Sequence, residues 1–154
     1  MDTTGFFAYP TLAAAAAVAR PAPDPGFLPH ASAPEWDAVL AATETLRYRP
    51  GEVVLRAGER DRAFYLLLDG HVEAEAAMLA APAVLGAAAF LDDRPRTATV
   101  RARGHAEVAR MSWDACEVLA ARDPRLGRAI LAELGRGIAD LARAAGTPLP
   151  GWTG

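Results

Sequence analysis

Residues 64–75 read FYLLLDGHVEAE and contain the clearest β pattern of the chain. Phe64–Leu68 is a continuous apolar run of strand length, and Asp69-Gly70 is a dipeptide typical of tight hairpin turns. Apolar and polar residues then alternate over Val72–Glu75, as they do in a strand with one buried face. The stretch therefore predicts a strand, a hairpin turn at Asp69-Gly70 and a second strand.

Further short strands are predicted on both sides of this stretch. Residues 46–49 alternate in polarity before a Pro50-Gly51 turn, and Val53–Leu55 is a short apolar run. Toward the C-terminus, Thr97–Ala102 and Ala106–Met111 read as two strands separated by a turn. Glycines recur where tight turns need a positive φ, at Gly51, Gly58, Gly70 and Gly86. Many short strands with regular glycine turns indicate a barrel or sandwich over 46–111.

Helical patterns flank the strands. Ser32 followed by Pro34 and Glu35 is typical of a helix N-terminus, and we expect a helix over 33–45. Ser112 can cap a second helix, and Asp123-Pro124 ends that helix and begins a third. In the third helix, apolar residues recur at three- and four-residue steps: Leu126, Ile130, Leu131, Leu134, Ile138 and Leu141. The chain is therefore expected to be α+β, with C-terminal helices over 112–146.

An Ala- and Pro-rich extension occupies residues 1–26, and residues 147–154 form a short tail. Thr11–Arg20 is a candidate for one short alanine-rich helix. Phe6, Phe7 and Tyr9 bring three aromatic side chains into one small segment. Because large aromatic groups are unfavourable in water, we expect this segment to dock. It can dock on the chain's own β-domain or on a partner subunit.

Composition and charge exclude several classes of protein. The formal net charge of -3 argues against broad attraction to nucleic acid or anionic lipid. The longest apolar run, Leu12–Ala19, is too short to span a bilayer. Asp2 is the sole charge ahead of that run, whereas a signal peptide begins with positive charge. We therefore expect a cytoplasmic protein without DNA or membrane contacts.

Other candidate chemistry is absent or weak. His30, His71 and His105 are widely spaced without a paired Glu or Cys motif, which predicts no metal site. Cys116 is the single cysteine, so no intrachain disulfide can form. Its position in a predicted helix is typical of a packed small side chain. The segment 147–154 is too short for a DNA-reading helix-turn-helix. We expect no enzyme active site and no attached DNA-binding domain.

The order of elements and several motifs resemble the cyclic-nucleotide-binding domain, which is shared by the catabolite activator protein and the regulatory subunits of protein kinase A. The matching motifs are YRPGEVVL at 48–55, GE at 58–59, FYLLLDGHV at 64–72, and VLG at 84–86 through PRTATV at 95–100. The resemblance extends from Phe27 to Ala145. It implies one domain over 27–146, an antiparallel β-roll of the jelly-roll or cupin-like double-stranded barrel type. An N-terminal helix and two C-terminal helices would flank the roll.

The resemblance also implies a binding site. In this family a short helix after a glycine cradles the cyclic phosphate of cAMP or cGMP, and an arginine ahead of the next strand contacts it. Here that helix would be Gly86–Phe90, with Arg96 as the phosphate arginine. The implied ligand residues are Gly86, Ala87, Ala88, Arg96 and Thr97.

Within the implied ligand site, the chain departs from the family at the residue after the glycine. The family has a glutamate directly after the glycine, and its carboxylate accepts a hydrogen bond from the ribose 2′-hydroxyl. This chain has Ala87 there. Loss of a hydrogen bond to a charged group costs about 1.5–3 kcal/mol, roughly a factor of ten to a hundred in affinity. Arg96 also has a purely structural alternative, in which it binds no ligand and pairs with a nearby acid: Asp92, Asp93 or Glu52.

Two functions remain open. The first is a non-catalytic, stand-alone domain with weak or no nucleotide binding, acting as an assembly subunit of a larger bacterial complex. It would contact a protein partner or a second copy through two sets of residues: Phe6, Phe7 and Tyr9, and the helical stripe Leu134, Ile138 and Leu141. The stripe can instead pack on the roll. The alternative function is a small cAMP- or cGMP-responsive sensor that signals to a partner through its C-terminal helix.

Overall fold

The computed structural model describes residues 10–11, 14–15, 27–75 and 77–146. Its elements follow one another as β1 (Pro10–Thr11), β2 (Ala14–Ala15), α1 (Ala33–Ala41), β3 (Glu44–Tyr48), β4 (Val53–Leu55), β5 (Ala63–Ala74), β6 (Ala77–Ala80), β7 (Ala83–Leu85), α2 (Ala87–Asp92), β8 (Val100–Ser112), α3 (Trp113–Arg122) and α4 (Pro124–Ala145). The α+β fold and the antiparallel β-roll with flanking helices are both confirmed.

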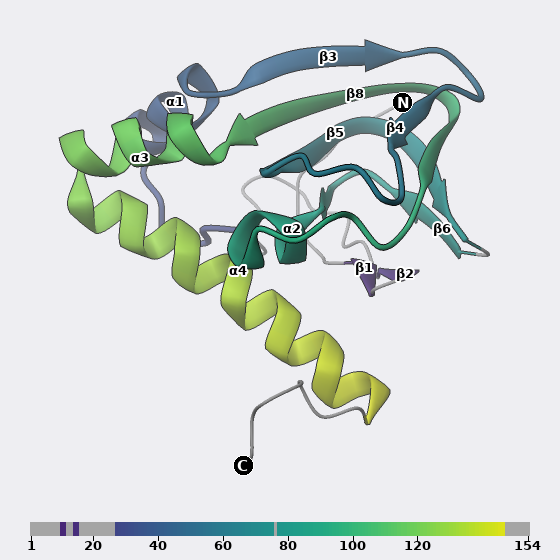
Figure 1. The fold of residues 1–154 in the computed structure, drawn as a ribbon. Coiled ribbons are helices and arrows are strands. Elements are labelled where there is room, and N and C mark those ends of the chain that lie inside the picture. The colour runs from purple at the N-terminus through teal and green to yellow at the C-terminus, as the bar shows by residue number, and fades with distance from the viewer. Residues whose placement is uncertain (1–9, 12–13, 16–26, 76, 147–154) are drawn as a thin grey trace.

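The main sheet is built around two long strands. β8 pairs with β3, β4 and β5, while β5 also pairs with β6 and β7, all antiparallel. In Figure 1, β3, β5 and β8 lie along one another, α1 and α3 sit at one end, and α2 lies between the strands and α4. The short helix expected after Gly86 therefore sits where the sheet and the last helix meet.

β5 is buried on both faces, which explains its unbroken apolar run. Phe64 and Leu66 belong to a core between the sheet and the helices, while Tyr65 and Leu67 belong to a second core inside the roll. Since successive side chains of a strand point to opposite faces, a strand between two cores shows no alternation. The sheet thus separates a helix-facing core from a roll-facing core.

The hairpin predicted at Asp69-Gly70 is wrong, because β5 runs through that dipeptide without a break. Its pairing with β8 shifts register on both sides of Gly70 instead. Gly70 has a φ of 94°, and a Cβ there would lie 2.2 Å from the His105 carbonyl oxygen. The glycine therefore permits a bulge and a close approach of two backbones, not a chain reversal.

The two strands predicted around Gly104 are likewise one strand, β8, and residues 97–99 precede it. Gly104 has a φ of 104° within this strand, so it marks a bend and not a turn. The short strands β6 and β7 were not predicted. β6 (AMLA) is half alanine, a residue with little strand preference, and β7 (AVL) has only three residues, so neither shows a β pattern.

The first helix is shorter than the predicted span 33–45. It begins as expected with a capping box between Ser32 and Glu35, but it ends at Ala41. The Thr43 hydroxyl donates to the Leu40 carbonyl oxygen, and Glu44–Tyr48 pairs with β8. Tertiary pairing with a central strand therefore overrides the helical pattern over the last residues.

At the N-terminus, the predicted helix Thr11–Arg20 is wrong where the structure describes it. Thr11 lies in β1 and pairs with Ala14 of β2. The remainder of that segment, including Phe6, Phe7 and Tyr9, lies outside the described residues.

Gly127 allows α3 and α4 to pack closely. A Cβ at Gly127 would lie 2.3 Å from the Cβ of Ala120 on α3. We therefore expect Gly127→Ala to lower the free energy of unfolding by about 1–3 kcal/mol through overpacking, measured by urea denaturation. Gly135→Ala, on the same helix with nothing within 4 Å of its Cβ, is the matched control and should raise stability by roughly 0.5–1 kcal/mol. Equal shifts in both variants would contradict this account of the contact.

Candidate ligand-binding site

The turn at Gly86 joins β7 to α2 and is specific to glycine for two reasons. Gly86 has a φ of 76°, a region that other residues rarely adopt. In addition, a Cβ there would lie 2.3 Å from Nη1 of Arg96. The helix that follows therefore starts in contact with the arginine that the sequence assigns to the ligand.

The short helix α2 is held down by one aromatic side chain. Phe90 is fully buried, and its ring meets Phe64 of β5 edge-on at 5.0 Å between ring centres. On the other side, Phe90 packs 5.1 Å from the ring of Trp113, the first residue of α3. Since α2 has only six residues, this anchoring sets its position more than its own helical propensity does.

The loop ahead of β5 binds the C-terminal end of α2 through two arginines. Arg62 donates from Nε to the Phe90 carbonyl oxygen at 2.8 Å, and its guanidinium lies 3.6 Å above the ring of Trp113. Arg60 donates to the carbonyl oxygen of Asp93 and lies 3.6 Å from its carboxylate. Cations are favourable at a helix C-terminus because its carbonyl groups lack helical partners.

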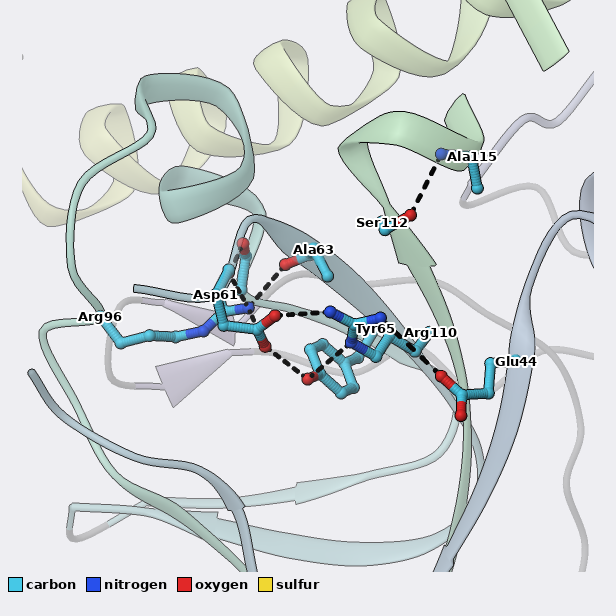
Figure 2. A network of polar contacts seen from close by, with 9 residues as sticks. Glu44, Asp61, Ala63, Tyr65, Arg96, Arg110, Ser112 and Ala115 are labelled. Carbon is cyan, nitrogen blue, oxygen red and sulfur yellow. Dashed lines mark hydrogen bonds and ion pairs between the residues drawn. The ribbon is translucent and has the colours of Figure 1, made fainter. Parts of the chain in front are cut away.

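Arg96 crosses the same region and is buried, with 3% of its side chain exposed. Nη1 donates to the Gly86 carbonyl oxygen at 3.1 Å. Nη2 donates to the carbonyl oxygens of Asp61 and Ala63, each at 2.7 Å, and to the Asp61 carboxylate at 3.1 Å. Figure 2 shows the guanidinium between α2 and the start of β5. Arg96 thus connects the glycine ahead of α2 to the start of β5.

Asp61 is the centre of the polar network drawn in Figure 2. Its carboxylate accepts from the Tyr65 hydroxyl at 2.6 Å, from Nη2 of Arg110 at 2.6 Å and from Arg96. Burial raises the pKa of Asp61, but the hydrogen bonds from Tyr65, Arg110 and Arg96 outweigh it, so the pKa lies below its usual value. Burial and the bond to Asp61 raise the pKa of Tyr65 to about 12. One ionised carboxylate therefore serves two guanidinium groups.

The sequence suggested Asp92, Asp93 or Glu52 as a purely structural partner of Arg96. The structure shows Asp61 in that role instead. Asp92 accepts from the amide of Arg94 at 3.0 Å, and Asp93 interacts with Arg60. Glu52 accepts from the Arg49 amide at 2.7 Å.

Sequence reasoning missed Asp61 as the observed partner. A local signal existed: Asp61 is an acid between two arginines, directly ahead of the apolar strand. Its distance of 35 residues along the chain from Arg96 concealed the pairing.

The Nε nitrogen of Arg96 differs from the two Nη nitrogens in having no protein acceptor among the described residues. This nitrogen is also buried. A buried donor left unsatisfied costs about 1–3 kcal/mol, and such groups usually have a functional explanation or an unseen partner.

A cavity of about 400 Å³ lies beside this arginine. It is enclosed by β-strand residues of the roll, by α2 and the segment after it, and by α4. Its lining is formed by Leu55, Ala74, Leu79, Val84, Leu85, Gly86, Ala87, Ala88, Ala89, Asp92, Arg94, Pro95, Arg96, Thr97, Ala98, Val100, Ile138 and Leu141. A volume of this size is in the range of small-molecule sites.

Comparison with known proteins identifies this arrangement. The family model of the cyclic nucleotide-binding domain matches residues 45–123, which include β5, α2 and Arg96. The chain belongs to the cyclic nucleotide-binding domain family. The match therefore covers the roll and α2, whereas the α4 residues of the cavity wall, Ile138 and Leu141, lie outside it.

Relatives of this cyclic nucleotide-binding domain include regulatory proteins. The chain is 35% identical over 83 residues to a cAMP-dependent protein kinase regulatory subunit of Emericella nidulans, covering 49% of this chain and 20% of that protein. It is 35% identical over 92 residues to the same type of subunit from Pyricularia oryzae, covering 55% and 24%. The chain thus spans about a fifth to a quarter of the length of these relatives.

Solved structures show the same fold. A cyclic nucleotide-binding domain from Methylobacillus flagellatus superposes with a TM-score of 0.69 at 23% sequence identity, over 75% of this chain and 70% of that one. The described part of this domain contains no helix that is long and apolar enough to cross a membrane. Within the same residues, no three His, Cys, Asp or Glu side chains are grouped so as to hold a metal ion.

The ligand residues expected from the sequence come together in this cyclic nucleotide-binding domain. The five positions Gly86, Ala87, Ala88, Arg96 and Thr97 all line the cavity. At the family's glutamate position, Ala87 contributes a methyl group and no acceptor.

The three residues of the docking stripe predicted on α4 lie in two different environments. Ile138 and Leu141 line the cavity, whereas Leu134 is fully buried in the core between the helices and the sheet. For Leu134, packing within the chain is the observed arrangement. A partner contact through this stripe stays a prediction.

Proposed function

We propose that this domain is a non-catalytic regulatory module that binds a small anionic ligand in the cavity beside Arg96. The observation that carries the proposal is a formed cavity of about 400 Å³ whose wall includes the buried cation Arg96 and the four other positions that the resemblance assigns to the ligand. The positive charge of a guanidinium beside the cavity favours an anionic ligand over a neutral one. The regulatory nature of the curated relatives supports the same class of function.

Binding of cAMP or cGMP is proposed to be weak. The ribose 2′-hydroxyl would face Ala87, which provides no acceptor. A site that leaves this hydroxyl unpaired loses roughly a factor of ten to a hundred in affinity. A micromolar site would become one with a dissociation constant near 10⁻⁵ to 10⁻⁴ M, by about 1.4 kcal/mol for each factor of ten.

α4 is the element that would transmit occupancy of the cavity. Ile138 and Leu141 contribute to the cavity wall, and α2 packs on the same helix. A ligand that fills the cavity would therefore contact α4 directly and bias its position. The partner that reads this change would be a separate protein or a second copy of the chain.

Isothermal titration of cAMP, cGMP and 2′-deoxy-cAMP into the full chain tests this function. We expect dissociation constants in the high micromolar range, with cAMP and 2′-deoxy-cAMP equal within about threefold because no group accepts the 2′-hydroxyl. Ala88→Phe is the control: Ala88 is exposed and lines the cavity, so the larger side chain should block binding while the fold is retained. Binding that survives unchanged in this variant would place the ligand elsewhere.

The assembly role and the cytoplasmic location predicted from the sequence stay predictions. The aromatic residues on which the assembly role depends, Phe6, Phe7 and Tyr9, lie outside the described residues. Removal of residues 1–26 followed by a pull-down of partners is the experiment that addresses them.

A further inference from the structure

The described part of the N-terminal extension contacts the elements that enclose the cavity. β1 and β2 form an antiparallel pair, with Thr11 opposite Ala14 and Pro10 opposite Ala15. β1 contacts α4 and β7, and β2 contacts β6. In Figure 1 these two short strands lie apart from α1 and α3. The N-terminal strand pair, β1 and β2, therefore packs on the domain at three elements: β6, β7 and α4.

The same three elements supply part of the cavity wall. β6 contributes Leu79, β7 contributes Val84 and Leu85, and α4 contributes Ile138 and Leu141. Because β1 contacts both β7 and α4, it bridges the roll to the last helix. A segment that bridges two walls of a cavity restrains their movement relative to each other.

The composition of the extension suits a contact that can be released. No Asp, Glu, Lys or Arg occurs between Asp2 and Arg20, and β6 and β7 carry no charged residue either. Such a segment can pack on these strands without burying an unpaired charge. Residues 13–17 are all alanine, and because alanine offers little apolar area, the docking free energy is small. A ligand of modest affinity can therefore outweigh it.

We propose that the N-terminal strand pair is an autoinhibitory element, which holds α4 against the roll and opposes ligand binding in the cavity. This proposal rests on the proposed function, because it assigns the regulation of the same site. A ligand that contacts Ile138 and Leu141 biases the position of α4, while the strand pair ties α4 to β7. By linkage, if release of the strand pair raises ligand affinity by some factor, bound ligand weakens the docking of the strand pair by the same factor. Occupancy of the cavity would thus free the N-terminal extension for a partner.

The test is a double substitution in the full chain, Ala14→Asp with Ala15→Asp. Because successive side chains of a strand point to opposite faces, the pair places a charge on both faces of β2, whichever of them meets the uncharged strand β6. We expect amide hydrogen exchange over residues 77–85 and 138–145 to become faster by about threefold or more. Isothermal titration should show cAMP binding tighter by about the same factor. Added negative charge alone disfavours an anion, so tighter binding cannot come from the charge itself.

Two further measurements accompany the double variant. Ala41→Asp with Ala121→Asp adds the same charge at exposed positions of α1 and α3 outside the cavity wall, and it should change neither exchange nor affinity. In the unaltered chain, saturating cAMP should speed exchange at residues 10–15, as linkage requires. This last measurement needs no substitution, so it stands even where the double variant fails to fold.

The other results separate this proposal from the proposed function. Unchanged exchange of both wall segments in the folded double variant would overturn the docking of the strand pair. Faster exchange with unchanged or weaker cAMP binding would overturn the autoinhibition and leave the proposed function in place. Bound cAMP that leaves exchange at residues 10–15 unaltered would do the same. Absence of cAMP binding at millimolar concentration in both chains would overturn the proposed function and, with it, the regulation of the site.

Discussion

Replacement of Arg96 by methionine is expected to lower the free energy of unfolding by about 3–5 kcal/mol, the range for removing one partner of a buried ion pair. Methionine keeps much of the aliphatic stem but removes all four hydrogen bonds of the guanidinium. The carbonyl oxygens of Gly86 and Ala63 would then be left without these donors next to the core. For a chain of this length the melting temperature should fall by on the order of 10 °C.

Thermal and urea denaturation followed by tryptophan fluorescence measure this effect. Arg94→Met is the matched control, because Arg94 is exposed on the cavity rim two residues away and its replacement should shift stability by less than about 0.5 kcal/mol. Arg96→Lys retains the charge without the planar fork and should fall between the two. A methionine variant as stable as the control would show that Arg96 does not hold the start of α2 against β5.

Ala87→Glu is expected to increase the affinity for cAMP by about ten- to a hundredfold. The substitution places a carboxylate at the first position of α2, on the wall of the cavity, where the family carries its glutamate. A charged acceptor for the ribose 2′-hydroxyl contributes about 1.5–3 kcal/mol. Isothermal titration of the variant and the unaltered chain with cAMP measures the gain.

Two comparisons separate this gain from a general effect of charge. Ala88→Glu adds the same carboxylate one residue later on an exposed position, and it should leave cAMP binding unchanged or weaker. The gain in Ala87→Glu should also be confined to cAMP and be absent for 2′-deoxy-cAMP. An equal gain for both nucleotides would mean that the new carboxylate acts through Arg96 and not on the ribose.

The sequence predicted those features that depend on neighbouring residues. The capping residues Ser32 and Ser112 begin α1 and α3 as expected, and Gly86 takes the positive φ that starts the short helix α2. Local hydrogen bonds and backbone conformations are encoded within a few residues, so these positions are readable without the fold. The motif that carries Arg96 could therefore be placed from the sequence.

Contacts between distant segments were beyond the sequence patterns. Asp69-Gly70 has the composition of a hairpin, yet β5 continues because pairing with β8 on one side and β6 on the other compensates for the bulge at Gly70. The end of α1 was similarly decided by the pairing of β3 with β8. In both cases tertiary hydrogen bonding outweighed a local preference of at most about 1 kcal/mol per residue.

What the sequence by itself determined about this protein is the presence of α1, α3 and α4, the turn at Gly86, and the short helix after it with alanine in place of the family's glutamate. The tertiary structure alone decided that Arg96 pairs with Asp61, that this pair shares Arg110, and that Ile138 and Leu141 of α4 close the cavity. The physical reason is the distance along the chain over which each kind of interaction acts. Periodicity and capping report the surroundings of a residue within its own element, whereas a buried charge takes whichever partner the packing of the sheet brings within reach.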